Sequence, residues 1–140
     1  MQLQRFVLAQ DPVWDQVCAE LAQGRKQGHW MWFVFPQLTA LGRSATAKHY
    51  GLSGLDEARA YLAHPVLGPR LRQACERVLR HPQLTAEHIF GEVDAMKLRS
   101  CMTLFERAAD EADSCFTRCL ASHFGGERDP LTDRLLAGSE

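Results

Sequence analysis

The sequence predicts an all-α fold: a single helical domain over residues 1–140, built as a compact orthogonal bundle of about six to eight short helices. Apolar residues recur at helical spacing through most of the chain. No segment alternates apolar and polar residues as a half-buried strand does, and no Asn-Gly or Asp-Gly hairpin turn occurs. The composition, 46% hydrophobic and 24% charged, is that of an ordinary globular domain.

The first expected helix begins at Asp11-Pro12, because Asp is a good N-cap and proline suits the first helical position. Its apolar residues repeat at helical spacing before Gly24 ends it: Val13, Trp14, Val17, Cys18 and Leu21. The next segment, Trp30 to Phe35, is apolar and aromatic throughout. A strand there would have no partner, so a buried helical turn is predicted.

Ser44 starts a short helical stretch that ends at Tyr50-Gly51. Ser53 and Asp56 then have the spacing of a capping box and predict a helix that ends at His64-Pro65. The helix after it keeps one apolar face until Pro82, a residue that cannot continue a helix.

Thr85 is expected to cap a short turn that ends at Gly91, and Asp94 is expected to cap the helix that follows. That helix has the cleanest apolar stripe of the chain: Leu98, Cys101, Met102, Phe105 and Ala109. A further helix ends at Gly125-Gly126, and Asp129-Pro130 opens a last short helix.

Charge is distributed unevenly along the chain. Sixteen Lys and Arg against seventeen Asp and Glu give a net charge of −1, which argues against general nucleic-acid binding. Residues 25–80, however, hold nine basic and three acidic residues. This basic middle favours either an anionic small-molecule ligand or a surface that pairs with the acidic ends of the chain.

No apolar run approaches the roughly 18 residues of a membrane helix, and the N-terminus lacks the pattern of a signal peptide. We therefore predict a soluble, cytoplasmic protein without a membrane partner. The five cysteines form no Cys-x-x-Cys pair and fall on apolar stripes, which predicts reduced, buried thiols. Cys115, Cys119 and His123 share one helix face, but apolar neighbours share it too, so no metal site and no cofactor are expected.

The segment from His29 to Gln37 contains two of the three tryptophans. Trp30 and Trp32 either anchor the core or stack on a base or nicotinamide ring. Its edges carry His29 and Gln37, which need hydrogen-bond partners.

The turn at Gly42, Arg43 and Ser44 follows this segment. Glycine permits close backbone approach, and the start of a helix favours anions. Arg43 and Lys48 are therefore candidate phosphate contacts, with Ser44 beside them. The alternative is an ordinary capped turn with a solvated arginine.

Candidate proton-transfer groups are His29 and His64, although a histidine at a helix boundary more often bonds nearby backbone. Asp94 or Glu57 would supply the carboxylate that hydrolysis needs. Lys97 shares a helix face with Asp94 and Ser100 but is adequately explained as solvated.

We expect one concave surface from the early part of the chain, closed by His64 or Lys97 from later helices. The early residues that form it are His29, Trp32, Gln37, Arg43 and Ser44.

Motifs along nearly the whole chain resemble one bacterial family. They are His29–Gln37, Leu41–Ser44, Tyr50-Gly51, Ala60–Leu62, His64-Pro65, Leu67-Gly68, Arg70-Leu71, Ile89–Gly91, Asp94, Lys97-Leu98, Ser100 and Met102–Phe105. The family is the domain of unknown function numbered 1810, sometimes mislabelled calpastatin. The resemblance implies an all-helical domain and no particular activity. Cys101 stands where the family commonly has a second serine.

A shorter stretch, Lys48-His49-Tyr50 followed by Ala58, is similar to the NADAR family of ADP-ribose glycohydrolases, with Lys48 where that family has a carboxylate. The leading hypothesis is a protein that binds a nucleotide-like ligand, either ADP-ribose or an NAD-derived molecule. Its enzymatic form is a glycohydrolase-type hydrolase. The alternative is a non-catalytic protein-interaction module.

Overall fold

Ten α-helices and two 3₁₀ turns make up residues 2–139, the part of the chain that the computed structural model describes. The helices are α1 Gln4–Gln10, α2 Trp14–Gln23, α3 Met31–Val34, α4 Ala45–His49, α5 Leu55–Ala63, α6 Leu67–Leu79, α7 Ala86–Phe90, α8 Glu92–Ala109, α9 Cys115–Phe124 and α10 Pro130–Ser139. The 3₁₀ turns are η1 Asp11–Val13 and η2 Thr39–Leu41. Within these residues there is no strand, which confirms the all-α prediction.

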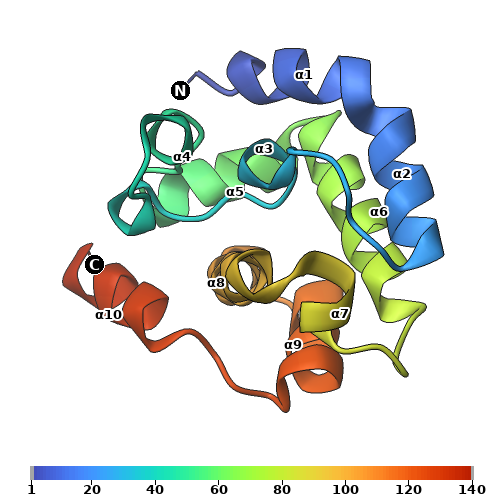
Figure 1. Ribbon diagram of the computed structural model, residues 1–140. Coiled ribbons are helices and arrows are strands. Elements are labelled where there is room, and N and C mark those ends of the chain that lie inside the picture. The colour runs from blue at the N-terminus through green and yellow to red at the C-terminus, as the bar shows by residue number, and fades with distance from the viewer. Residues whose placement is uncertain (1, 140) are drawn as a thin grey trace.

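Helix α8 is the centre of the fold and is seen nearly end-on in Figure 1. It packs against α5, α7, α9 and α10. Helix α6 packs against α2, α5 and α9. The predicted stripe of α8 is buried, with Leu98, Met102 and Phe105 each 0% exposed. No helix among residues 2–139 combines the length and apolar character needed to cross a membrane.

Local signals fixed most helix ends as expected. The hydroxyl of Ser44 accepts a hydrogen bond from the Ala47 N–H at 3.1 Å, and that of Thr85 accepts one from the His88 N–H at 3.0 Å. Gly24 ends α2 with a φ of 73°, in the left-handed region that glycine adopts without strain. The aromatic segment forms the short helix α3, as predicted.

Three helix starts differ from the prediction. Ser53 does not cap the helix that follows it, because the N-cap of α5 is Gly54 and no side chain caps this helix. Asp11-Pro12 does not begin the first helix, because η1 continues directly from α1, a helix that the sequence did not predict and that buries Phe6. Asp94 does not cap α8, which begins two residues earlier at Glu92. The positive φ of Gly91, 83°, ends α7 and lets α8 start at once, so Asp94 lies in the first turn and is free to pair elsewhere.

The turn between α5 and α6 depends on two residues. His64 Nδ1 accepts hydrogen bonds from the N–H groups of Val66 at 3.1 Å and Leu67 at 3.2 Å. A Cβ atom at Gly68 would lie 2.1 Å from the carbonyl oxygen of Leu62, so only glycine fits. Hydrogen bonds to His64 and the close packing of Gly68 on Leu62 therefore fix this turn.

Helix α10 is attached to α8 through a buried carboxylate. Asp129 is 8% exposed, and its Oδ2 accepts hydrogen bonds from the Ser100 hydroxyl at 2.9 Å and from the N–H and hydroxyl of Thr132. Its own N–H donates to the Thr103 hydroxyl at 2.9 Å. Asp129 thus starts α10, as the sequence predicted, and also fixes it to the central helix.

Candidate functional site

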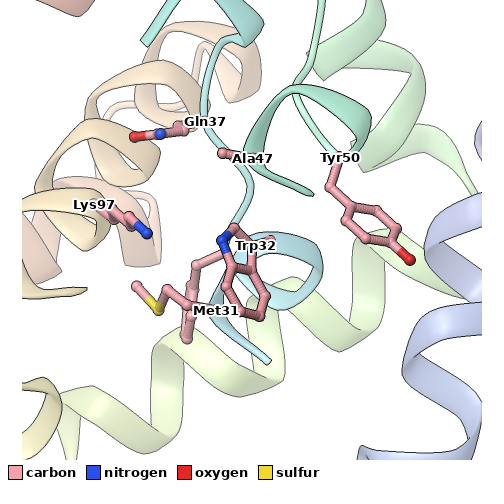
Figure 2. A pocket seen from close by; sticks show the side chains of 7 residues that line it. Met31, Trp32, Gln37, Ala47, Tyr50 and Lys97 are labelled. Carbon is pink, nitrogen blue, oxygen red and sulfur yellow. The ribbon is translucent and has the colours of Figure 1, made fainter. Parts of the chain in front are cut away.

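A small hollow opens where α3, α4 and α8 meet (Figure 2). It is lined by Met31, Trp32, Phe35, Gln37, Ala47, Tyr50 and Lys97. The space among these side chains is about 230 Å³ when the open solvent above them is counted, and only a small part of that space is enclosed. The hollow is therefore a shallow depression with room for about one water-sized group, and most of a bound ligand would lie outside it.

Three of the predicted site residues meet here: Trp32, Gln37 and Lys97. The Lys97 ammonium lies 5.7 Å from the centre of the Trp32 ring. Figure 2 shows that ammonium pointing toward the side of Trp32 that carries the indole nitrogen. Among residues 2–139, no side-chain hydrogen bond joins any of the three to another protein group. Their donors are available to a ligand.

Behind the hollow, Trp30 is fully engaged within the protein. It is 1% exposed, and its indole N–H donates to Glu20 Oε1 at 2.9 Å. The same oxygen accepts hydrogen bonds from the N–H groups of Gln27 at 2.7 Å and Gly28 at 2.9 Å. Trp30 is therefore a core anchor with no free ring face, and the expectation that it stacks on a ligand is corrected.

Hydrogen bonds from these donors keep the Glu20 carboxylate ionised. Burial alone would raise its pKa, but hydrogen bonds from Gly28 and Gln27, and then from Gln16 and Trp30, outweigh burial. They hold the pKa of Glu20 at about 2, so the carboxylate is ionised throughout the physiological range.

Asp94 forms ion pairs with two lysines, Lys26 and Lys97. Its Oδ2 is 2.8 Å from the Lys26 ammonium and its Oδ1 is 3.8 Å from the Lys97 ammonium. Lys26 in turn lies 5.2 Å from the centre of the Trp30 ring. Two cations and one anion leave this group with a net positive charge beside the hollow. Asp94 does not line the hollow itself, but it contacts the cation that does.

The predicted histidines and Glu57 lie outside the hollow. His29 is exposed, and the Nδ1 of His64 accepts the two backbone hydrogen bonds that start α6, as the alternative interpretation expected. Glu57 is 8% exposed and accepts a hydrogen bond from the Ser53 N–H at 2.9 Å, which is a structural role.

The predicted phosphate contacts also lie outside the hollow. Arg43 and Lys48 are exposed, and the Ser44 hydroxyl is used to cap its own helix. Helix α4 contributes Ala47 and Tyr50 to the lining instead. The concave surface is therefore smaller than predicted. Ser44 caps α4, and neither it nor Arg43 lines the hollow.

Several cations of the basic middle pair with acids from the flanking parts of the chain. The pairs are Lys26 with Asp94 at 2.8 Å, Arg70 with Asp11 at 2.9 Å, and Arg72 with Glu111 at 3.0 Å. This supports the interpretation that the basic and acidic parts meet in the fold. Lys97, which lies outside the basic middle, also pairs with Asp94, but the 3.8 Å distance is longer than a hydrogen bond.

Sequence reasoning missed four lining residues: Met31, Phe35, Ala47 and Tyr50. Met31 and Phe35 are four residues apart and flank Trp32, so the helical interpretation of this segment already implied a shared face. Ala47 and Tyr50 are three apart on the next helical stretch. Their approach to α3 depends on tertiary packing and had no local signal. In residues 2–139, no group of three or more His, Cys, Asp or Glu side chains is arranged to hold a metal ion.

Comparisons with known proteins agree with this fold. The model of a family described as "Protein of unknown function (DUF1810)" matches residues 1–136. A solved structure, the crystal structure of the conserved hypothetical protein Rv1873 from Mycobacterium tuberculosis, is 52% identical to the chain with a TM-score of 0.90. The alignment covers 96% of each chain. No curated protein matches the chain.

Proposed function

Since this chain belongs to the DUF1810 family of proteins of unknown function, we propose a function from its own site. The hollow at Trp32, Gln37 and Lys97 binds a small ligand that joins an anionic group to a flat ring. Nucleotide-like molecules such as ADP-ribose and NAD-derived compounds have this chemistry.

One observation carries the proposal: three side chains that line one hollow carry donors with no hydrogen-bond partner among residues 2–139. They are the Lys97 ammonium, the Gln37 amide and the Trp32 indole N–H. Ammonium and indole groups donate but do not accept, so an acceptor oxygen is the group that satisfies them. A phosphate or carboxylate also matches the net positive charge of Lys26, Asp94 and Lys97.

The ring of Trp32 supports the second half of the ligand. Trp32 is partly exposed, whereas Met31 and Phe35 beside it are buried and give the hollow an apolar base. Stacking of a base on an aromatic side chain contributes about 1–3 kcal/mol. Because the hollow is small, the remainder of such a ligand would extend over α4, where Arg43, Ser44 and Lys48 are the proposed further contacts.

Hydrolysis of the ligand is the finer form of this proposal. Asp94 is the carboxylate nearest Lys97, at 3.8 Å, and would act as the general base of a glycohydrolase-type reaction.

A second candidate, a protein-interaction surface, rests on α8. Val93 is 68% exposed and Met96 is 72% exposed, and both lie within one helical turn of Lys97. Large apolar side chains that project into solvent are typical of contact surfaces when they are grouped.

Thermal unfolding with AMP, ADP-ribose, NAD and inorganic phosphate tests the binding proposal. A ligand at 100 times its dissociation constant adds about 2.7 kcal/mol of stability. We expect ADP-ribose or NAD to raise the melting temperature more than phosphate alone, with quenching of Trp32 fluorescence.

The Lys97→Gln and Trp32→Leu variants should each lose this response. Arg80→Gln removes an exposed cation at the end of α6, away from the hollow, and is the control that should keep it. A shift that is equal in Lys97→Gln and in the unmodified protein would overturn the site, and the absence of any shift would overturn the ligand class. Retained binding in a Val93→Ser, Met96→Ser double variant separates the two candidate functions.

A further inference from the structure

Three cysteine thiols meet between α6 and α9, and none of them lines the hollow. Cys75 on α6 is 0% exposed, and its thiol interacts with the thiols of Cys115 and Cys119. Its Sγ also lies 3.2 Å from the carbonyl oxygen of Cys115. The two cysteines of α9 are four residues apart and therefore share the face that packs on Cys75.

Cys115 differs from the other two in its position. It is the first residue of α9, directly after the N-cap Ser114, whose hydroxyl accepts a hydrogen bond from the Thr117 N–H. Cys115 is 5% exposed, whereas Cys75 and Cys119 are each 0% exposed. Among the three thiols, an oxidant in solution therefore meets Cys115 first.

The surroundings of both cysteines of α9 favour the thiolate. Cys75 and His123 lower the pKa of Cys119 to about 6, but Cys119 is 0% exposed, so Cys115 is the thiolate that an oxidant can reach. The hydrogen bond from the Cys75 thiol, and then the Arg72 and Arg118 guanidinium groups, lower the pKa of Cys115 against the opposing effects of burial and of Glu76. Ion pairs from Arg72 to Glu111 at 3.0 Å and from Arg118 to Glu76 at 3.1 Å fix both arginines. The second pair joins α6 to α9 and so holds the thiols together.

We propose that Cys115 is a site of reversible oxidation by hydroperoxides, with Cys75 as the resolving thiol and a Cys75–Cys115 disulfide as the product. The geometry resembles the general pattern of redox-sensing cysteines, in which the more accessible thiolate lies beside a second, fully protected thiol. This assignment is independent of ligand binding at Lys97.

The chemistry balances with hydrogen peroxide as the oxidant. The Cys115 sulfur attacks a peroxide oxygen, the O–O bond breaks, and the departing hydroxide takes up a proton to leave as water, which gives a sulfenic acid. The Cys75 sulfur then attacks the Cys115 sulfur, while the Cys75 proton leaves with the sulfenic hydroxyl as a second water. Two thiols are oxidised to one disulfide, and one peroxide is reduced to two waters.

Cys18 is the natural comparison within the same chain. It lies on α2, is the most exposed of the five cysteines, and has no thiol neighbour among the interactions of residues 2–139. If exposure alone governed oxidation, Cys18 would react first and would stop at the sulfenic acid or proceed to irreversible acids.

Treatment of the folded protein with about one equivalent of hydrogen peroxide tests the proposal. We expect titratable thiols, counted after denaturation, to fall from the five of the sequence by two, and dithiothreitol to restore them. Trypsin places each cysteine in its own peptide, and cleavage after Arg118 separates Cys115 from Cys119. Mass spectrometry should find peptide 73–77 linked to peptide 108–118.

The variants Cys115→Ala and Cys75→Ala should both abolish the linked peptide. Cys75→Ala should in addition leave a sulfenic acid at Cys115 that dimedone labels, and Cys18→Ala should behave as the unmodified protein. Circular dichroism confirms folding, and Cys115→Ala changes only a residue at a helix end. A link between Cys75 and Cys119, preferential oxidation of Cys18, or no paired loss of thiols would each overturn the proposal.

Discussion

Two tryptophan–lysine pairs share Asp94 as a counter-ion, but one pair belongs to the core and the other lines the hollow. Lys26 lies 5.2 Å from the Trp30 ring, and Lys97 lies 5.7 Å from the Trp32 ring; both ammonium groups pair with Asp94. The Trp30 N–H is bonded to Glu20, whereas the Trp32 N–H has no partner among residues 2–139. The same two residue types therefore form part of the core in one pair and part of the candidate site in the other. The difference is whether the tryptophan N–H has a hydrogen-bond acceptor within the protein.

Backbone groups also hold the pair of Lys26 and Trp30 in place. Lys26 donates from its ammonium to the Gly28 carbonyl at 2.7 Å, and Glu20 accepts from the Gln27 and Gly28 N–H groups. The chain between α2 and α3 thus folds around one carboxylate. Gln37 and Lys97, on the open side, have no comparable acceptor.

Replacement of each tryptophan gives the largest contrast. We expect Trp30→Ala to lower the free energy of unfolding by about 3–5 kcal/mol, because it empties a core position and leaves Glu20 without one of its donors. Trp32→Ala should cost below about 1 kcal/mol, because the ring is partly exposed. Urea denaturation measures both. Similar losses in the two variants would show that Trp32 is also a core residue.

Glu20→Gln tests the carboxylate that closes the first pair. Its pKa in the folded protein, about 2, lies below the ordinary value of 4.5. The resulting stability is therefore full above pH 4.5 and is lost as the pH falls toward 2. We expect Glu20→Gln to cost roughly 2–3 kcal/mol at pH 7. The variant should also show a flatter decline of stability between pH 5 and pH 2, and an unchanged decline would contradict the role of Glu20.

Asp94→Asn acts on both pairs at once. It removes the counter-ion of Lys26, whose side chain is 9% exposed, at a cost of about 1–2 kcal/mol in unfolding free energy. It also raises the positive charge beside Lys97, so an anionic ligand should bind a few-fold more tightly. Calorimetry measures the affinity. If Asp94 is a general base, the same variant loses hydrolysis while it keeps this tighter binding.

Lys97→Gln should have the smallest effect on stability, below about 0.5 kcal/mol, because the ammonium makes only long contacts, with Asp94 at 3.8 Å and with the Trp32 ring at 5.7 Å. Its effect on binding should be the larger one, at least tenfold for an anionic ligand. The affinity of the unmodified protein should fall as salt is raised from 50 to 200 mM, and that of the variant should fall less. Titrations at the two salt concentrations check this, and equal salt dependence would remove Lys97 from the site.

Local chemistry explains what the sequence could predict. Ser44, Thr85 and Gly24 act on backbone groups within three or four residues, so their roles follow from spacing alone. Trp32 and Gln37 are close in sequence, and their shared location was expected for that reason.

The remaining features depend on contacts between distant segments. Asp94 has the sequence signature of a helix cap, but α8 begins before it, directly after Gly91. Its partner Lys26 comes from the distant segment between α2 and α3. Trp30 and Trp32 have the same local signature, and only the approach of Glu20 from α2 distinguishes them.

The buried carboxylate that joins α10 to α8 makes the docking of this last helix all-or-none. An apolar contact can slide by a fraction of a turn at little cost, whereas Asp129 keeps its hydrogen bonds to Ser100, Thr103 and Thr132 in one register only. A buried polar group left without a partner costs about 1–3 kcal/mol. We therefore expect intermediate positions of α10 to be depopulated, and the amide protons of this helix to exchange with solvent through a single cooperative opening rather than by gradual fraying.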